Sequence, residues 1–242
     1  MTQPSASLPQ PFPPLDFANS EATLAELVRK ALRHDILSLA FQPGMHLTLR
    51  ELTERYGVRA TPVREALWSL VGEGLGESEA KIGFRVPRLK RDRLSALAAL
   101  RLRIEPWGLA QSLETAGKAW VASVERAYTG LTRVDALVGD QRKIDDNWES
   151  AHRAFHMALL SGCQPASLLR EVEAWYVETD RYRRLSSPGL GATAANKYDH
   201  DILFEAVMSM NAGLAVETLE RHILETSQRH LAYFDAAHML DD

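Results

Sequence analysis

The sequence predicts a mostly α-helical protein in two domains, the first carrying a small β wing and the second forming an all-helical bundle. Two short segments with helical spacing of apolar residues lie on either side of Gly57, and short alternating pieces follow around Gly83. Every long segment from residue 93 onward has helical period. We therefore expect a tail over residues 1–20, a winged domain over residues 21–90 and a helical domain over residues 91–242.

The composition is that of a soluble globular protein. With 242 residues, 45% hydrophobic and 25% charged, the chain is long enough for two modest domains with real cores. No apolar run approaches the roughly 18 residues that span a bilayer, and the N-terminus lacks the basic start and apolar core of a secretory signal. The single cysteine, Cys163, rules out an internal disulfide and suits a reducing compartment. We expect a cytoplasmic protein with no membrane partner.

The charge is distributed unevenly along the chain, whose formal net charge is -4. Residues 21–92 carry 12 Lys and Arg against 10 Asp and Glu, whereas residues 93–242 carry 16 against 21. This difference in sign is a modest form of what is expected when one domain contacts phosphate and the other does not. Residues 1–20 hold five of the eleven prolines, which predicts a mobile tail.

Two helices are expected before the glycine turn. The second covers about residues 49–56, with Leu52 facing the core and Tyr56 as a further core candidate, and Gly57 then supplies the turn. The first covers about residues 21–39 and ends before the helix-breaking FQPG segment. Its apolar stripe consists of Leu24, Leu27, Val28, Ala31, Leu32 and Ile36.

A third helix follows the glycine turn and has two unlike faces. It opens near Thr61 and Pro62, because the missing N–H of proline would have no partner in the first turn. The face expected to point toward the core consists of Val63, Ala66, Leu67 and Leu70. Residues that recur at steps of three and four on the opposite face are Thr61, Arg64, Glu65 and Trp68.

The segment GEGLGESEAKIGFRVPRL, residues 72–89, changes to short alternating pieces. We expect a two-stranded hairpin, or wing, around residues 81–83, and a linker over residues 89–94. The glycines of residues 72–76 could be mistaken for a phosphate-binding loop. They follow a helix rather than a strand and lack the Lys-Ser/Thr ending, so we interpret them as the turn into the wing.

Two short helices joined by a tight glycine turn and followed by a wing form the winged helix-turn-helix plan, whose second helix lies in the major groove of DNA. Arg64 on the outward face can donate to a guanine edge or a phosphate, and Thr61 can reach the DNA backbone. Arg50 and Arg59 flank the same surface. From periodicity alone, the alternative of an amphipathic helix with solvated arginines stays open.

The wing offers a second place for DNA contact. Gly83 lets a backbone approach the duplex closely, with Lys81 and Arg85 beside it to meet phosphates.

The order of these motifs resembles the DNA-binding domain of the GntR family of bacterial transcription regulators over about 70 residues. The matching segments are the Pro-Gly pair at 43–44, LRELTERYGV, TPVREAL, EGL and the wing glycine. In that family the corresponding positions contact operator DNA, which implies this role for Arg50, Arg59, Thr61, Arg64 and Gly83. This chain has Arg59-Ala60 where the family often has Ser-Arg, so one usual contact is either lost or supplied by Arg59.

The helical domain is expected to hold about six helices, with breaks at residues 115–117, 138–140, 162–165 and 186–191. Its histidines attract attention because two of them, in HRAFH, lie four residues apart on one helix face. Two more lie on later helices, so a bundle could bring four nitrogens together, a ligand set that zinc or nickel favours. The four are His152, His156, His200 and His222. Hydrogen-bonded histidines without metal are the alternative.

This domain resembles the FCD effector domain of the fatty-acid-regulator branch of the GntR family. That family carries DxxFH on one helix and a histidine on each of two later helices, which together bind a divalent metal. Here His152 replaces the aspartate, so the site should hold metal less strongly by charge and prefer nitrogen-loving ions. The resemblance also implies a small carboxylic acid as effector, with Arg101 of RLRIE as a carboxylate partner. A surface or intersubunit salt bridge is the alternative for Arg101.

The residues fit a metalloprotease or a di-iron enzyme less well than a regulator. A metalloprotease needs HExxH, and HRAFH has Arg153 in place of the glutamate. A di-iron bundle needs two ExxH motifs, and Glu149 with His152 supplies only one. We therefore expect a ligand-responsive regulator rather than an enzyme, acting as a homodimer on a pseudo-palindromic operator. The competing hypotheses are a metal-dependent enzyme acting on a small carboxylate and a purely helical interaction module.

Overall fold

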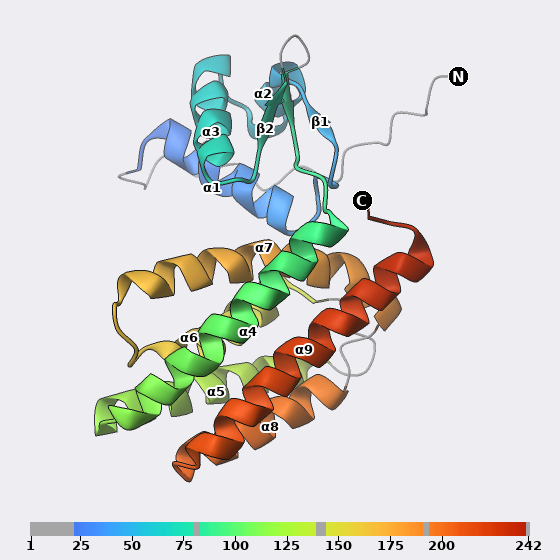
Figure 1. Ribbon diagram of the computed structural model, residues 1–242. Coiled ribbons are helices and arrows are strands. Elements are labelled where there is room, and N and C mark those ends of the chain that lie inside the picture. The colour runs from blue at the N-terminus through green and yellow to red at the C-terminus, as the bar shows by residue number, and fades with distance from the viewer. Residues whose placement is uncertain (1–21, 80–82, 139–143, 191–193, 241–242) are drawn as a thin grey trace. The chain divides into compact units, whose positions relative to one another are not determined.

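The computed structural model describes residues 22–79, 83–138, 144–190 and 194–240. The chain divides between Leu89 and Lys90 into two compact units, here called unit 1 and unit 2. Figure 1 traces both, with three helices and a small sheet in unit 1 and long helices in unit 2. The predicted tail over residues 1–20, and Lys81 and Ile82 of the predicted wing, lie outside the described residues.

Three helices build unit 1: α1 (Leu24–Leu37), α2 (Leu49–Tyr56) and α3 (Ala60–Gly72). Both α1 and α2 begin with a capping box, in which a threonine hydroxyl and a glutamate three residues later satisfy two backbone N–H groups. Gly57 ends α2 in the left-handed conformation, with φ of 65°. This conformation favours glycine and produces the tight turn into α3.

The wing contains a third strand that the sequence did not predict. Strands β2 (Glu77–Glu79) and β3 (Gly83–Arg85) pair antiparallel as the expected hairpin, and β1 (His46–Leu47) pairs antiparallel with β3 on its other edge. The sheet order is therefore β1-β3-β2. Two residues are too few to show an alternating pattern, which is why β1 escaped prediction.

The core of unit 1 is apolar around one buried ionic group. The predicted inward face of α3 is buried, as is most of the α1 stripe, but Leu24 is 39% exposed and Leu27 only partly buried. Asp35 of α1 accepts from Nε of Arg55 at 2.8 Å and from the hydroxyl of Tyr56 at 2.6 Å, which ties α1 to α2. The buried apolar residues are Val28, Ala31, Leu32, Ile36, Phe41, Leu47, Leu52, Tyr56, Val63, Ala66, Leu67, Leu70, Leu75, Phe84 and Val86.

Six helices account for the ordered elements of unit 2 within the described residues, as predicted. They are α4 (Arg91–Glu114), α5 (Lys118–Val138), α6 (Asp146–Leu160), α7 (Ser167–Leu190), α8 (Ala194–Met208) and α9 (Ala212–Ala237). The first of them begins at Arg91, inside the stretch predicted as a linker, so that prediction is wrong beyond Lys90. None of the helices, in the part of the chain that is described, is long and apolar enough to cross a membrane.

In unit 2, α4 and α9 lie side by side along the front of the bundle in Figure 1, and α5, α6 and α8 pack behind them. Helices α6, α7 and α9 all contact α4 or one another, so the space between them is closed on several sides. The apolar side chains of unit 2 form one continuous core, which includes Leu109, Phe155, Leu159, Tyr176, Leu203 and Leu219.

The predicted break at residues 186–191 begins too early, because α7 continues to Leu190. Pro188 has no N–H to donate to the carbonyl of Arg184, which would normally end the helix. The hydroxyl of Ser187 donates to that carbonyl at 3.2 Å and so supplies the missing hydrogen bond.

Candidate functional site

The outward face of α3 is open to solvent. Thr61, Arg64, Glu65 and Trp68 are all exposed, with Trp68 at 54%, while the opposite stripe is fully buried. Arg59 stands at the N-cap position and its side chain makes no capping hydrogen bond. The first turn of α3 therefore places the backbone N–H groups of Ala60 and Thr61, which have no acceptor within the helix, beside an arginine, an arrangement suited to phosphate.

The other predicted DNA contacts are also exposed within unit 1. Arg50 lies in the first turn of α2 and is exposed. Gly83 is exposed and has φ of 108°, a conformation that favours glycine, and a Cβ there would lie 3.8 Å from the carbonyl oxygen of Leu47. Arg85 beside it lies within hydrogen-bond distance of the His46 ring, with Nη2 3.0 Å from Nε2, so it is partly committed inside the wing.

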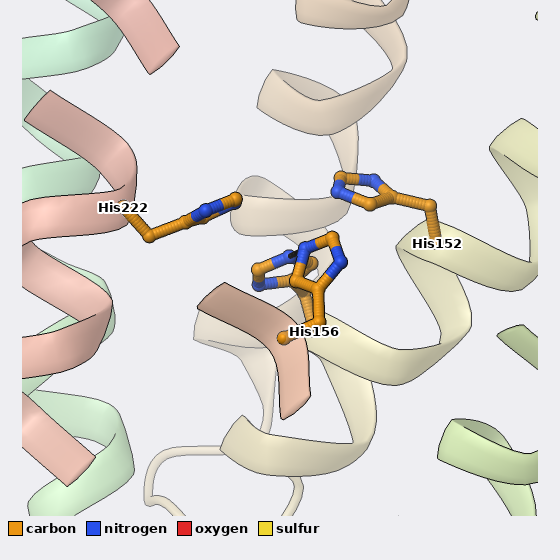
Figure 2. A group of neighbouring side chains, drawn as sticks. His152, His156 and His222 are labelled. Carbon is orange, nitrogen blue, oxygen red and sulfur yellow. Dashed lines mark hydrogen bonds between the residues drawn. The ribbon is translucent and has the colours of Figure 1, made fainter. Parts of the chain in front are cut away.

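Four histidines from three helices meet in the interior of unit 2. The imidazoles of His152 and His156 project from α6 and turn toward that of His222 from α9, as Figure 2 shows. His200 comes from α8, and one ring nitrogen from each of the four lies within 4.8 Å of those of the others. All four side chains are buried. The spacing in the sequence thus brings together the residues predicted to meet.

Burial favours the neutral form of the four histidines. Burial lowers the pKa of His152, His156 and His200 well below the ordinary value, because a charged imidazole is poorly solvated there. Burial also lowers the pKa of His222, although Asp199 acts in the opposite direction. Neutral imidazole is the form that binds metal, so burial shifts these histidines toward the form that can act as ligands.

Hydrogen bonds orient part of this donor set. Nδ1 of His222 lies 3.3 Å from a carboxylate oxygen of Asp199, the arrangement by which carboxylates commonly fix the tautomer of metal-ligating histidines. The hydrogen bond to His222 in turn lowers the pKa of Asp199. Nδ1 of His152 and of His156 are buried and have no hydrogen-bond partner among the described residues.

The donor set fits a divalent transition metal. Two imidazole nitrogens that share a tetrahedral ion at about 2.0–2.1 Å stand roughly 3.3 Å apart. Nε2 of His156 and Nε2 of His200 are 3.3 Å apart. A hydrogen bond between two neutral rings has a similar length, so the stronger indication is the convergence of four buried imidazole donors.

Two buried arginines lie close to the histidines, each held by acids. Nε of Arg183 donates to both carboxylate oxygens of Glu149, at 3.2 and 3.1 Å, and its Nη2 donates to Asp180 at 2.6 Å. After burial, the positive charge of Arg183 is the next contribution that lowers the pKa of His152. Glu149, which sequence analysis considered as part of an ExxH motif, is thus engaged in an ion pair.

Arg101 is the second buried arginine close to the histidines, and it is 5% exposed. Its Nε donates to Glu105 at 2.5 Å and its Nη2 to the hydroxyl of Tyr176 at 2.8 Å. The ring of Tyr176 lies 5.4 Å from that of His156 between centroids, so this pair reaches the edge of the histidine cluster. The alternative of a surface salt bridge is wrong, because the ion pair is internal and joins residues of the same helix.

Sequence reasoning did not find several polar residues of this interior. Trp148 lies four residues before His152 on the same helix and stacks on its ring. This spacing alone could have predicted that the two side chains lie on one helix face. Asp199 directly precedes His200, but its bond to His222 depends on helix packing that sequence spacing does not reveal. Arg183 and its acids gave no sequence signal, since charged residues on a long helix are usually solvated.

A winged helix-turn-helix unit followed by a helical bundle with a buried polar centre defines a class of DNA-binding transcription regulators with a separate regulatory domain. Residues 24–86 match the bacterial regulatory proteins of the gntR family, and residues 96–225 match the FCD domain. The chain belongs to the GntR family, and it has the two domains that the sequence resemblance indicated.

Curated relatives carry the same description. The chain is 32% identical over 211 residues to the HTH-type transcriptional regulator BphR of Paraburkholderia xenovorans, covering 87% of this chain and 86% of that protein. It is 28% identical to the HTH-type transcriptional repressor GlaR of Escherichia coli, covering 80% of this chain and 89% of the relative.

Solved structures share the fold. Escherichia coli McbR superposes with a TM-score of 0.70 at 18% identity, covering 88% of this chain and 99% of that chain. A transcriptional regulator GntR from Rhodococcus sp. RHA1 gives 0.71 at 19% identity, covering 86% and 97%. At these identities the likeness shows the fold alone, and it confirms the predicted mostly helical class with a small wing.

Proposed function

We propose that the protein is a ligand-responsive transcription regulator that binds a pseudo-palindromic operator as a homodimer and responds to a small carboxylic acid in unit 2. The observation that carries the proposal is the exposed outward face of α3, where Thr61 and Arg64 stand opposite a fully buried stripe. A helix buried on one side and polar on the other can enter a major groove without disturbing the core.

On this surface the residues have distinct roles. Arg64 donates to a base edge or phosphate, and Thr61 donates to the DNA backbone. Arg50 and Arg59 contribute phosphate contacts beside them, and the wing approaches the duplex at Gly83, where no side chain intervenes.

The histidine cluster is the proposed metal site, with zinc or nickel as the ion. His152, His156, His200 and His222 would be the ligands, and the ion would supply a Lewis acid for an effector carboxylate. Four neutral imidazoles leave the charge of a divalent ion uncompensated, which favours an anionic effector. Arg101 is the proposed second partner of that carboxylate, through the part of its guanidinium that Glu105 and Tyr176 leave unused.

A second copy of the chain is the proposed partner of α4. Leu100 and Trp107 are 39% and 43% exposed and stand seven residues apart on one helix face, with the exposed Arg103 between them. The neighbouring α9 exposes Glu217 and Glu220, which offers charge complementarity in a twofold contact. Effector binding then biases the spacing or orientation of the two winged units.

Elemental analysis tests the metal site. We expect protein purified without a His tag to contain about one transition-metal ion per chain. Substituting His156→Ala should lower the metal content, whereas His238→Ala, at an exposed position, should leave it unchanged. Metal-free protein whose DNA binding still responds to its effector would defeat the metal proposal.

Selection of sequences from a random duplex DNA library tests the regulatory function. We expect enrichment of a two-fold symmetric sequence, and an affinity for it that shifts when one member of a panel of small carboxylic acids is added. Turnover of a carboxylate by a protein that enriches no DNA sequence would favour the metal-dependent enzyme instead.

A further inference from the structure

His152 is held in place differently from His222. A carboxylate hydrogen-bonds Nδ1 of His222, whereas Nδ1 of His152 is buried and has no hydrogen-bond partner within the described chain. The ring of His152 instead lies flat against the indole of Trp148, with centroids 4.7 Å apart and planes at 15°. Stacking on Trp148 therefore orients the His152 ring, in place of the hydrogen bond to Nδ1 that usually does so in a metal-binding histidine.

The start of α6 explains why the indole lies there. Asp145 caps the helix by accepting from the backbone N–H of Trp148 at 2.8 Å, which fixes where the helix begins. Steps of four residues then align Trp148, His152 and His156 along one helix face.

The indole itself is clamped. It is 2% exposed, and its Nε1 donates to a carboxylate oxygen of Asp135 on α5 at 2.9 Å. Burial and this hydrogen bond hold the Trp148 side chain in one conformation, so it limits rotation of the His152 ring about its side-chain bonds.

The electronic character of indole makes this stack stronger when the histidine binds a cation. The indole face is electron-rich and attracts positive charge, while a neutral imidazole carries none. Donation of a nitrogen lone pair to a divalent ion makes the imidazole ring electron-poor, so the ring stacks more strongly in that state. A contact that is stronger in the bound state raises the affinity for the ion.

We propose that Trp148 is a positioning residue of the histidine site, holding the ring of His152 in its ligating orientation and strengthening that ligand's hold on a divalent ion. The inference rests on the metal site proposed above. His152 occupies the position where the related domain has aspartate. In this chain the stack with Trp148 would compensate for the negative charge that the aspartate would have contributed.

Competition with a chromophoric chelator, using zinc and the full-length chain, measures the effect. We expect Trp148→Leu to weaken zinc binding about tenfold to hundredfold, the usual range for residues that orient ligands. Trp148→Phe keeps an aromatic face but loses the bond to Asp135, and should weaken zinc binding by less. Trp120→Leu is the matched control, because Trp120 is also buried in this core and we expect its loss to leave zinc affinity unchanged.

A double-mutant comparison separates positioning from a general loss of structure. If Trp148 acts through His152, then Trp148→Leu should change zinc affinity little in a His152→Ala background. Equal loss in both backgrounds would overturn the proposal. Should Trp148→Leu fail to fold by circular dichroism, Trp148→Phe with and without His152→Ala gives the same comparison.

Cobalt(II) absorption gives a second readout, since its visible bands respond to the number and geometry of ligands. We expect Trp148→Leu to shift the bands toward those of His152→Ala. Zinc that fails to bind the natural protein, or binds His152→Ala equally well, would defeat the proposed metal site and this inference with it. Zinc binding weakened by His152→Ala but unaffected by Trp148→Leu would defeat the role of Trp148 alone.

Discussion

His230 should make the free energy of unfolding of unit 2 decrease as the pH falls below 7. It lies on α9, with Nδ1 2.7 Å from the hydroxyl of Ser186 on α7. Burial lowers its pKa from 6.5 to about 3, helped by the charges of nearby arginines. The unfolded chain takes up a proton near pH 6.5, whereas the folded chain resists it until about pH 3, so stability falls as pH decreases between these values.

The size of this loss in stability follows from the shift in the pKa of His230. Between pH 7 and pH 5 the folded state loses about 2 kcal/mol relative to the unfolded state on account of this one residue. Replacing His230→Asn removes the titrating group while leaving an amide near the position of Nδ1 to bond Ser186. The free energy of unfolding of the variant should therefore fall by about 2 kcal/mol less over this pH range.

Urea unfolding of metal-free protein at pH 7, 6 and 5 provides the assay. Of the five tryptophans only Trp68 lies in unit 1, so fluorescence in a Trp68→Phe background reports on unit 2. His238→Asn, at an exposed position, is the control and should keep the natural pH dependence. If His230→Asn has the same pH dependence as the natural chain, then His230 is not held neutral by burial and the reasoning is refuted.

Three further predictions concern the turn at Gly57, the buried ion pair of Arg101 and the proposed homodimer. Gly57→Ala should destabilise unit 1 by about 1–2 kcal/mol, because φ is 65° while an added Cβ meets nothing within 4 Å; an unchanged urea midpoint would contradict this. Arg101→Met should lower the free energy of unfolding of unit 2 by roughly 3–5 kcal/mol, because it leaves Glu105 buried and charged. Adding Glu105→Met should restore most of this stability. A double variant as unstable as Arg101→Met would show that the unpaired charge of Glu105 is not the cause of the loss. If the chain forms the proposed homodimer, Trp107→Glu should make it monomeric in analytical ultracentrifugation, and a variant that is still dimeric would remove α4 from the interface.

The sequence was informative wherever periodicity and local chemistry agreed. The two faces of α3 were predicted from steps of three and four residues, and the structure buries Val63 and Leu67 while exposing Arg64 and Trp68. The glycine turn at Gly57 was predicted because its conformation is a property of the residue itself.

Features that depend on distant partners could not be predicted in this way. The predicted break over residues 186–191 began too early, because α7 continues through Pro188 to Leu190 and the hydroxyl of Ser187 bonds the carbonyl of Arg184. The four histidines were anticipated from spacing and resemblance, but the arrangement around them was not. The bond from Trp148 to Asp135 and the pairing of Arg183 with Glu149 exist only because α5, α6 and α7 pack together.

Base preference at the operator, measured for the natural chain and for Arg64→Ala, tests the central claim most directly. With a randomised duplex selection followed by affinity measurements at fixed salt, the natural chain should enrich a two-fold symmetric sequence. Arg64→Ala should lose about 1–3 kcal/mol of binding and relax the preference at one position of each half-site. Unchanged affinity and preference would contradict the claim that the outward face of α3 reads DNA.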